Sequence, residues 1–234
     1  MKAVFIADAH LSGASDPNQK KLAKFLDSLS DIDTLFILGD IFDYWSGYDE
    51  VAGREYKEVL GSLKRVSAKG IKIIYLEGNH DFSMGPFFTD TVKADVYPDE
   101  AEITLDNKRA YLAHGDTVNM SLGYRLWRGL LRSFFFRIIV RLIPPEQGWN
   151  IAMRLSGKSR QYSIHKAVVE ERLKAFAQKK ISEGFDIVVL GHSHSAAVHD
   201  ENAGARKGVY ANPGSFSKGS SHLVFEGGRL RVKR

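Results

Sequence analysis

Histidine, aspartate and asparagine side chains follow five separate apolar segments of the chain, each time where the segment ends. Short apolar runs that end in glycine and polar residues are typical of buried strands followed by loops. An ordinary turn explains one such stretch, but five of them predict that the polar side chains converge. The five stretches are Asp8-Ala9-His10, Gly39-Asp40-Ile41-Phe42-Asp43, Gly78-Asn79-His80-Asp81, His114-Gly115-Asp116 and Gly191-His192-Ser193-His194.

These residue types predict a site for divalent metal ions. A carboxylate and an imidazole two positions apart, as at Asp8 and His10, can face one cation where an extended segment bends. Such ligands suit Mn, Zn or Fe better than Ca or Mg. Two ions that share a bridging carboxylate explain the number of candidate ligands, and such pairs clamp the attacking and leaving oxygens of phosphoryl displacement. The seven candidate ligands are Asp8, His10, Asp40, Asn79, His114, His192 and His194.

Alternating strands and helices must position these residues. Apolar runs at residues 2–7, 34–38 and 71–76 alternate with helical patterns at 17–30 and 50–69, which predicts a largely parallel sheet with ligands at the carboxyl ends of its strands. The second half predicts a hairpin, a helix at 163–180 and a strand at 186–190. We therefore expect two packed sheets with helices outside. The hairpin pairs 102–105 with 109–113, and the last strands are 196–199, 209–211, 222–225 and 229–232.

The length and composition of the chain limit the class of protein and its domain organisation. The 234 residues suffice for one large domain or one domain with an insertion, and 44% hydrophobic with 26% charged residues excludes a disordered chain. The absence of cysteine excludes disulfides and thiolate metal sites. The start of the chain has no signal-peptide pattern, and no apolar run reaches the ~18 residues of a membrane span. A cytoplasmic protein is expected.

In order and spacing, the five stretches resemble the motifs of the calcineurin-like metallophosphoesterase superfamily. The resemblance implies an α/β fold, a four-layer αββα sandwich of two mixed sheets. It further implies that Asp40 bridges the two ions and that His80 protonates the leaving oxygen or stabilises the transition state. It assigns Asp8, His10, Asp40 and His194 to one ion, and Asp40, Asn79, His114 and His192 to the other. Asp43, Asp81 and Asp116 are candidates either for orienting imidazoles or for forming turns.

The segment between the fourth and fifth motifs has an unusual composition. From 121 to 160 it carries eight Lys or Arg against Glu146 alone, a net charge of +7, whereas the whole chain carries +5. The remainder is therefore slightly acidic, which argues against a nucleic-acid partner. Arginines four apart, Arg128 with Arg132 and Arg137 with Arg141, predict a basic amphipathic helix that ends at Pro144-Pro145, before a second helix at 149–155.

This insertion allows two interpretations. It is either a helical hairpin that packs its apolar side on the domain with solvated arginines, or a cap over the metals. As a cap, its apolar side would receive acyl chains, and its cations would meet phosphates and an anionic membrane surface. The second interpretation places the protein on the cytoplasmic face of the inner membrane.

Within the superfamily, the chain is most similar to the UDP-2,3-diacylglucosamine pyrophosphatases of lipid A synthesis. The similarity lies in residues 5–10, in residues 114–117 and in the helical insertion before Gly191. It implies a single domain over 1–234 with a cap at about 120–165, and a manganese-dependent peripheral membrane hydrolase that releases UMP and 2,3-diacylglucosamine 1-phosphate. The family's third motif usually has Arg where this chain has His80. The residues implied in substrate binding are Asn79, His80, Arg154, Lys158, Arg160 and His192.

Other functions remain open from the sequence. One is a metallophosphoesterase, a phosphatase or phosphodiesterase, that acts on another phospholipid, a nucleotide or a phosphoprotein. Another is a non-catalytic scaffold, which the presence of all seven candidate ligands disfavours. Mn²⁺ is the expected metal, with Zn²⁺ or Fe²⁺ as alternatives, and the sequence does not distinguish a monomer from a dimer.

Overall fold

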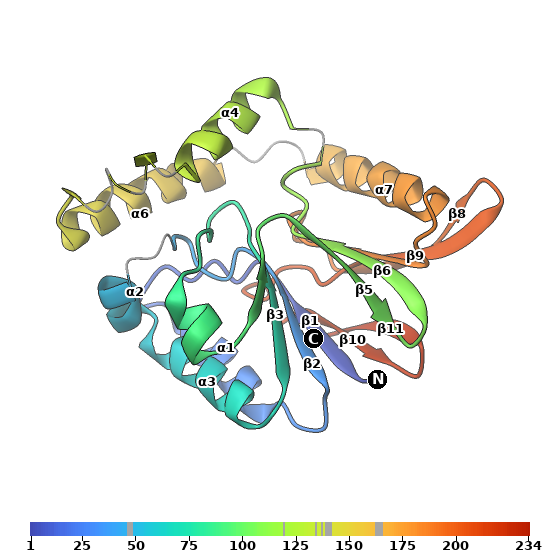
Figure 1. The fold of residues 1–234 in the computed structure, drawn as a ribbon, viewed down its shortest axis with the longest axis horizontal. Coiled ribbons are helices and arrows are strands. Elements are labelled where there is room, and N and C mark those ends of the chain that lie inside the picture. The colour runs from blue at the N-terminus through green and yellow to red at the C-terminus, as the bar shows by residue number, and fades with distance from the viewer. Residues whose placement is uncertain (46–48, 119, 134, 137, 139–141, 162–165) are drawn as a thin grey trace.

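The fold is an α/β sandwich built on two mixed β-sheets (Figure 1). The computed structural model describes residues 1–45, 49–118, 120–133, 135–136, 138, 142–161 and 166–234. The six-stranded sheet has the spatial order β11 (Arg229–Lys233), β10 (His222–Glu226), β1 (Ala3–Ile6), β2 (Thr34–Leu38), β3 (Lys72–Leu76) and β4 (Asp95–Tyr97). The five-stranded sheet has the order β5 (Glu100–Leu105), β6 (Lys108–Ala113), β7 (Ile187–Leu190), β9 (Arg206–Asn212) and β8 (Ala197–Ala203).

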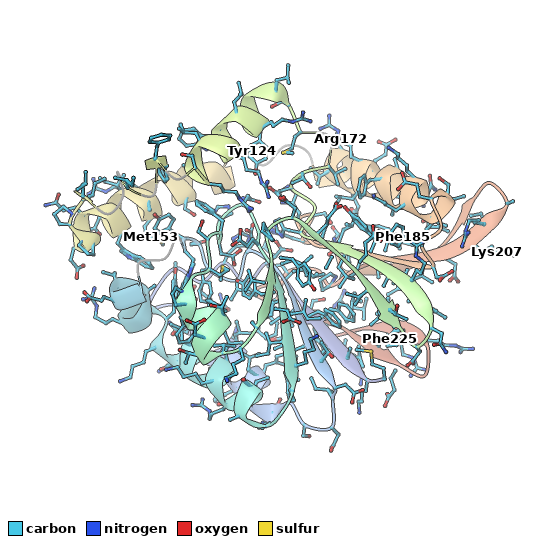
Figure 2. The ribbon with its side chains drawn as sticks, viewed as in Figure 1. Tyr124, Met153, Arg172, Phe185, Lys207 and Phe225 are labelled. Carbon is cyan, nitrogen blue, oxygen red and sulfur yellow. The ribbon has the colours of Figure 1, made fainter. Side chains whose placement is uncertain are left out.

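Helices cover the outer face of each sheet, so the predicted four-layer αββα sandwich is confirmed. Three helices pack on the six-stranded sheet, and α7 (Lys166–Ser182) packs on the other around Phe185 (Figure 2). The three are α1 (Pro17–Ser28), α2 (Asp49–Glu55) and α3 (Lys57–Ala68). The insertion contributes α4 (Leu122–Leu131) and α6 (Pro145–Gln161), and a short π-helix spans Phe87–Thr91.

The strand sequences explain this layering. In β1, Val4 and Ile6 face the helices while Phe5 faces the other sheet, because successive side chains of a strand alternate between its faces. Phe5 stacks on Phe36 with ring centroids 4.5 Å apart, and Phe225 joins the same core between the sheets (Figure 2). Each such buried side chain contributes about 1.5–3 kcal/mol. Strands with two buried faces read as continuous apolar runs.

The strand directions bring the polar loops together. β1 pairs parallel with β2, β2 with β3, and β6 with β7. Their carboxyl ends therefore lie at one edge of the sandwich, and Figure 1 shows α4 and α6 on that side of the molecule.

Some elements differ from the predicted ones. The helix expected at 50–69 is two helices, because Tyr56 leaves helical geometry (φ −113°, ψ 22°) and donates a buried hydrogen bond to the Leu11 carbonyl. The short β4 was not predicted, and β8 and β9 are longer than expected. The predicted hairpin is confirmed, since both residues of its turn, Asp106 and Asn107, have positive φ.

The insertion also differs from the prediction. α4 ends at Leu131 rather than continuing to Pro144, and the second helix begins at Pro145 rather than at 149. Residues 137, 139–141 and 162–165 lie outside the described residues, so the spacing of Arg137 and Arg141 and the start of the helix expected at 163 are not described. Of the helices that the structure describes, none is both long and apolar enough to cross a bilayer.

Candidate metal centre

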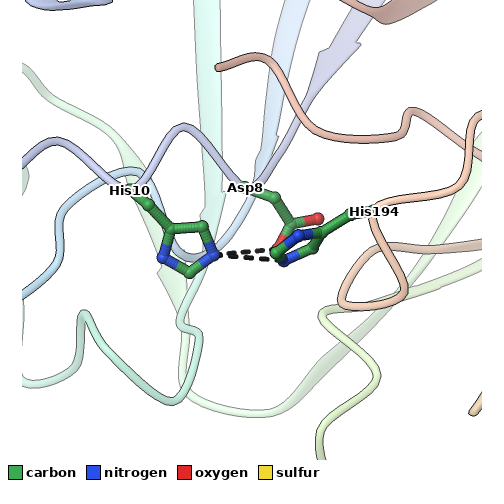
Figure 3. A group of neighbouring side chains, drawn as sticks. All are labelled: Asp8, His10 and His194. Atoms are coloured by element: carbon green, nitrogen blue, oxygen red, sulfur yellow. Dashed lines mark hydrogen bonds and ion pairs between the residues drawn. The ribbon is translucent and has the colours of Figure 1, made fainter. Parts of the chain in front are cut away.

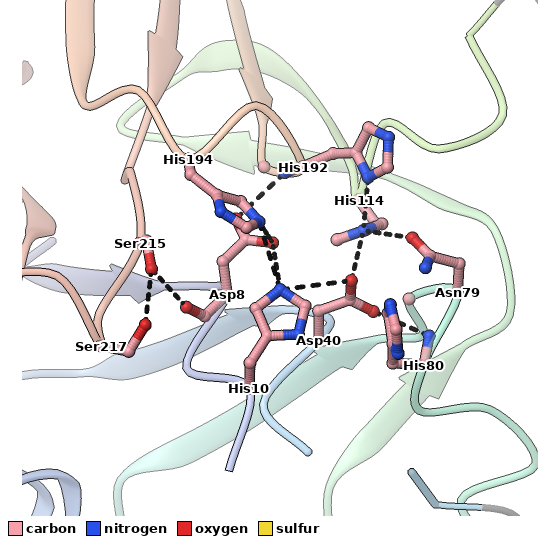
Figure 4. A network of polar contacts seen from close by, with 12 residues as sticks. Asp8, His10, Asp40, Asn79, His80, His114, His192, His194, Ser215 and Ser217 are labelled. Carbon is pink, nitrogen blue, oxygen red and sulfur yellow. Dashed lines mark hydrogen bonds and ion pairs between the residues drawn. The ribbon is translucent and has the colours of Figure 1, made fainter. Parts of the chain in front are cut away.

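All seven candidate ligands and His80 lie at one site (Figure 4). They come from the loops that follow five strands: Asp8 and His10 after β1, Asp40 after β2, Asn79 and His80 after β3, His114 after β6, and His192 and His194 after β7. The carboxylates of Asp8 and Asp40 are almost fully buried. A buried carboxylate is unfavourable unless a cation or hydrogen bonds compensate it.

One group of ligand atoms belongs to Asp8, His10 and His194 (Figure 3). Nε2 of His10 lies 3.2 Å from Nε2 of His194, which in turn lies 3.4 Å from Oδ1 of Asp8. That oxygen is buried and makes no hydrogen bond of good geometry with the described residues. Atoms bound to one ion at ~2.1 Å lie about 3.0–3.4 Å apart, so the group fits a single cation.

A second group contains Asp40, Asn79, His114 and His192. Nε2 of His114 lies 3.3 Å from Oδ2 of Asp40, 3.2 Å from Oδ1 of Asn79 and 3.2 Å from Nδ1 of His192. Nδ1 of His114 donates to the Leu38 carbonyl at 2.7 Å. This bond leaves a lone pair on Nε2, as a metal ligand requires.

Asp40 belongs to both groups. Its Oδ2 lies 3.3 Å from Nε2 of His114 and 3.8 Å from Nε2 of His10, while its Oδ1 accepts a hydrogen bond from the His80 amide at 2.9 Å. The oxygen and nitrogen donors present therefore fit a pair of divalent cations with one shared carboxylate.

The carboxylates make the site electrostatically suited to cations. Burial opposes ionisation of Asp40, but the imidazoles of His114 and His80 outweigh it and hold the pKa of that carboxyl well below its usual value. Burial also disfavours a charged His114, yet the Asp40 carboxylate beside it holds the pKa of the imidazole well above its usual value. Burial, followed by the charge of His114, lowers the pKa of His192. Asp40 is therefore ionised at neutral pH and attracts positive charge.

The backbone of the site is unusual. Five candidate ligands have positive φ between 46° and 67°, a region that non-glycine residues rarely adopt. Gly78 allows a close approach, because a Cβ there would lie 2.2 Å from Oδ1 of Asp40. The five strained residues are Asp8, His10, Asp40, His192 and His194.

The three neighbouring aspartates have different surroundings. Asp81 accepts hydrogen bonds from the amides of Asp40, Ile41 and Gly78 and from the Tyr75 hydroxyl, so it holds the loop backbone rather than an imidazole. Oδ1 of Asp43 lies 3.5 Å from Nδ1 of His10. Asp116 accepts from the Tyr124 hydroxyl of α4. Of the two roles left open by the sequence, Asp43 has the geometry for orienting an imidazole, whereas Asp81 has the turn-forming one.

Two supporting residues were missed from the sequence. Asn212 is fully buried and donates from Nδ2 to the Gly191 carbonyl, beside His192. Ser215 donates to the Asp8 carbonyl at 2.7 Å (Figure 4). Asn212 is the last residue of β9 and Ser215 follows that strand, so the same signal of polar residues at the end of an apolar strand identifies them.

The insertion contacts the site through Arg128 of α4 and through Arg132, the residue that caps the end of this helix. Arg132 forms an ion pair with Glu77 at 3.0 Å and donates to the Gly78 carbonyl. Arg128 pairs with Asp99 and lies 3.4 Å from Asp116. Both arginines thus pair with carboxylates of the protein. Both also line the pocket next to the site, so a contact between these cations and phosphates stays a prediction.

A mainly apolar pocket of about 390 Å³ lies between the insertion and the site. Asn79 and His80 line it beside Trp127, Leu131 and Leu155. Arg154 is exposed on α6 and is not among its lining residues. The side chains of Lys158 and Arg160 lie outside the described residues, so the roles of these three cations remain predictions.

Comparisons with known proteins concern the fold and the sequence of the chain. The fold resembles a solved archaeal phosphodiesterase with a TM-score of 0.50 and 14% identity, over 100% of this chain and 99% of that one. UDP-2,3-diacylglucosamine hydrolase of Haemophilus influenzae (strain PittGG) is 30% identical over 206 residues, 86% of each chain. The corresponding hydrolase of Aeromonas hydrophila is 27% identical over 241 residues, covering 100% of this chain and 98% of its own.

Fold and site together define a metal-dependent hydrolase that acts on phosphorus ester or anhydride bonds. The chain belongs to the calcineurin-like phosphoesterase family, whose model matches residues 1–196. Membership in this family implies bound divalent metal ions.

Proposed function

We propose that the protein hydrolyses UDP-2,3-diacylglucosamine to UMP and 2,3-diacylglucosamine 1-phosphate, a step of lipid A biosynthesis. The similarity to hydrolases named for this substrate, over most of the chain, supports the proposal.

The proposed cofactor is a pair of Mn²⁺ ions. The ions would supply positive charge to the phosphate oxygens and lower the pKa of an attacking water. Asp8, His10, Asp40 and His194 would hold one ion, and Asp40, Asn79, His114 and His192 the other. Asn79, His80 and His192 would also contact the reacting phosphate, and His80 would give a proton to the leaving oxygen.

The apolar pocket beside the candidate ligands is the observation that best supports a lipid substrate. Its apolar lining can bury acyl chains, whereas Asn79 and His80 offer polar atoms to the phosphates. A phosphatase for small polar esters has no need of such a lining. We therefore propose that α4 and α6 form a cap, within an insertion at about 120–165 of a single domain over 1–234.

The insertion would also place the enzyme at its substrate. α4 and α6 expose large apolar side chains, including Leu126 at 75% and Leu155 at 58%. We propose that this surface rests on the anionic cytoplasmic face of the inner membrane as a peripheral contact.

Release of UMP tests the proposal directly. Purified protein with Mn²⁺ and UDP-2,3-diacylglucosamine in mixed micelles should give UMP, which chromatography quantifies, and UDP-N-acetylglucosamine should be a far poorer substrate. Asp40→Ala serves as the inactive control. If the diacylated substrate is untouched while simple phosphodiesters are hydrolysed, the lipid substrate is wrong and the phosphatase or phosphodiesterase alternative is favoured.

A further inference from the structure

Ser156 of α6 contacts the side chain of His80. Its Oγ lies 2.9 Å from Nδ1 of His80, although the two residues are 76 positions apart. Ser156 is only 8% exposed and lines the pocket beside the candidate metal centre. The second helix of the insertion therefore reaches the imidazole next to the candidate ligands.

The same nitrogen has a second partner. The backbone carbonyl of Asp43 lies 3.1 Å from Nδ1 of His80. A carbonyl can only accept, so this contact requires a proton on Nδ1. A serine hydroxyl can accept from the same N–H, and both contacts are then satisfied by one protonation state. Nε2 is left as the ring nitrogen that exchanges a proton with substrate.

The main chain and the ring neighbours place His80 at the reacting centre. The His80 amide donates to Oδ1 of Asp40 at 2.9 Å. Its ring meets the His10 ring edge to face at 5.1 Å. The imidazole of His80 can then move only by rotation about its side-chain bonds, and the contacts at Nδ1 restrict this rotation.

We propose that Ser156 is a positioning residue that holds the proton of His80 on Nδ1 and its Nε2 toward the leaving oxygen. The inference rests on the proposed proton-donating role of His80 but not on the lipid substrate. Water forms the new P–O bond as the old one breaks with its electron pair on the leaving oxygen. That oxygen takes the Nε2 proton of the imidazolium, Nδ1 keeps its own proton, and the proton lost by water returns to Nε2 through solvent. α6 thereby becomes part of the catalytic arrangement.

Leaving-group dependence tests the proposal on substrates without acyl chains. Ethyl and 4-nitrophenyl esters of UMP share one phosphoryl group, but only the ethoxide needs a proton to leave. Ser156→Ala should lower kcat for the ethyl ester about 10- to 100-fold, a part of the 10²–10⁴ that general acid catalysis supplies. The nitrophenyl ester should lose no more than about 3-fold, and Ser156→Thr should restore both, because it keeps the hydroxyl.

A double-mutant cycle separates positioning from substrate contact. In a His80→Ala background, Ser156→Ala should have no further effect on kcat. Equal losses on both esters, a loss that persists without His80, or a loss confined to KM would each overturn the proposal.

A spectroscopic measurement covers the case in which neither ester is hydrolysed. In ¹⁵N-histidine NMR spectra of the zinc-loaded protein, recorded at a pH at which the His80 ring is neutral, the His80 signal, assigned with His80→Ala, should show the Nδ1–H tautomer in wild type and in Ser156→Thr. Ser156→Ala should shift toward a mixture. An Nε2–H tautomer in the wild type would refute the positioning role, whereas failure on the diacylated substrate alone would refute only the proposed function.

Discussion

Asp40 is the residue on which both groups of candidate ligands depend. Its Oδ2 lies near His114 and near His10, so Asp40→Ala removes the donor that the two groups share. We expect loss of bound metal and a decrease in turnover of at least about 10³-fold. Metal analysis by mass spectrometry and kinetics on a simple phosphodiester measure the two effects.

His80→Ala is the matched comparison for this prediction. We expect it to keep its metal and to lower turnover by about 10²–10⁴, since it removes a proton donor rather than a shared ligand. Equal metal loss in both variants would show that the division of roles between Asp40 and His80 is wrong.

Gly78 is a second residue whose replacement has a specific consequence. A Cβ at this position would lie 2.2 Å from Oδ1 and 2.7 Å from the amide nitrogen of Asp40. Gly78→Ala should displace the Asp40 loop, lower stability by about 1–3 kcal/mol and weaken metal binding. Thermal unfolding with and without Mn²⁺ measures both.

The control for this variant is Gly53→Ala. Gly53 lies in α2, and apart from its chain neighbours and the backbone of its own helix, no atom of the residues that the structure describes lies within 4 Å of its added Cβ. Its unfolding temperature should equal or exceed that of wild type. A Gly78→Ala protein that behaves like Gly53→Ala would contradict the close packing around Asp40.

The sequence could predict which residue types form the site, but it could not predict the backbone conformation of these residues. Parallel strands bring their carboxyl ends to one edge, so polar residues after β1, β2 and β3 had to lie close together. Spacing carries no information on φ, and the left-handed backbone at Asp8 and His192 follows from hydrogen bonds made by distant loops. Ser156 was missed because α6 reaches the site only through tertiary packing.

At the scale of elements, α4 is held on the molecule by its cations. Arg132 pairs with the largely buried carboxylate of Glu77 and donates to the Gly78 carbonyl, next to Asn79. Arg132→Met leaves Glu77 buried without this cation, which is costly. Amides of α4 and of residues 77–81 should exchange hydrogen about tenfold faster, equivalent to ~1.4 kcal/mol of local stability. Hydrogen-exchange mass spectrometry resolves both segments.

Arg125→Met provides the control on the same helix. Arg125 is exposed, so its removal should leave exchange in α4 and in 77–81 at wild-type rates. Similar acceleration in both variants would indicate a general loss of helix propensity rather than a specific anchor.

The boundaries of the helices and of the hairpin show which structural features the local sequence does and does not predict. The break between α2 and α3 follows from the burial of Tyr56 against Phe42 and Trp149, which come from two other segments. Helical periodicity continues across that break, so local sequence alone predicts one helix. The hairpin at Asp106-Asn107 was predictable because both residue types tolerate positive φ.

At the scale of the whole molecule, metal should stabilise the fold. The site joins loops from both sheets, so ions bound there connect the two halves of the sandwich. Metal at 1,000 times its Kd stabilises a protein by about 4 kcal/mol, which shifts the unfolding temperature by about 8–16 °C for a chain of this size. Calorimetry before and after chelation measures the shift. Asp40→Ala should not respond to chelator, and an unchanged wild type would contradict a stabilising metal pair.

The orientation of α4 predicts how the molecule meets its substrate. Arg128 and Arg132 turn toward the body, which leaves Leu126 at 75% exposure on the outer surface. A solvated basic helix would show the opposite arrangement, so the exposed apolar side supports the contact with lipid proposed above. Leu126→Glu should lower binding to phosphatidylglycerol vesicles about tenfold, because the introduced carboxylate cannot enter the bilayer interface. Hydrolysis of the 4-nitrophenyl ester should not change, since Leu126 does not line the pocket.

Val168→Glu on α7 is the control, because it also introduces a carboxylate in place of an aliphatic side chain at a partly exposed position. Equal losses of vesicle binding in the two variants would refute a membrane contact specific to the insertion.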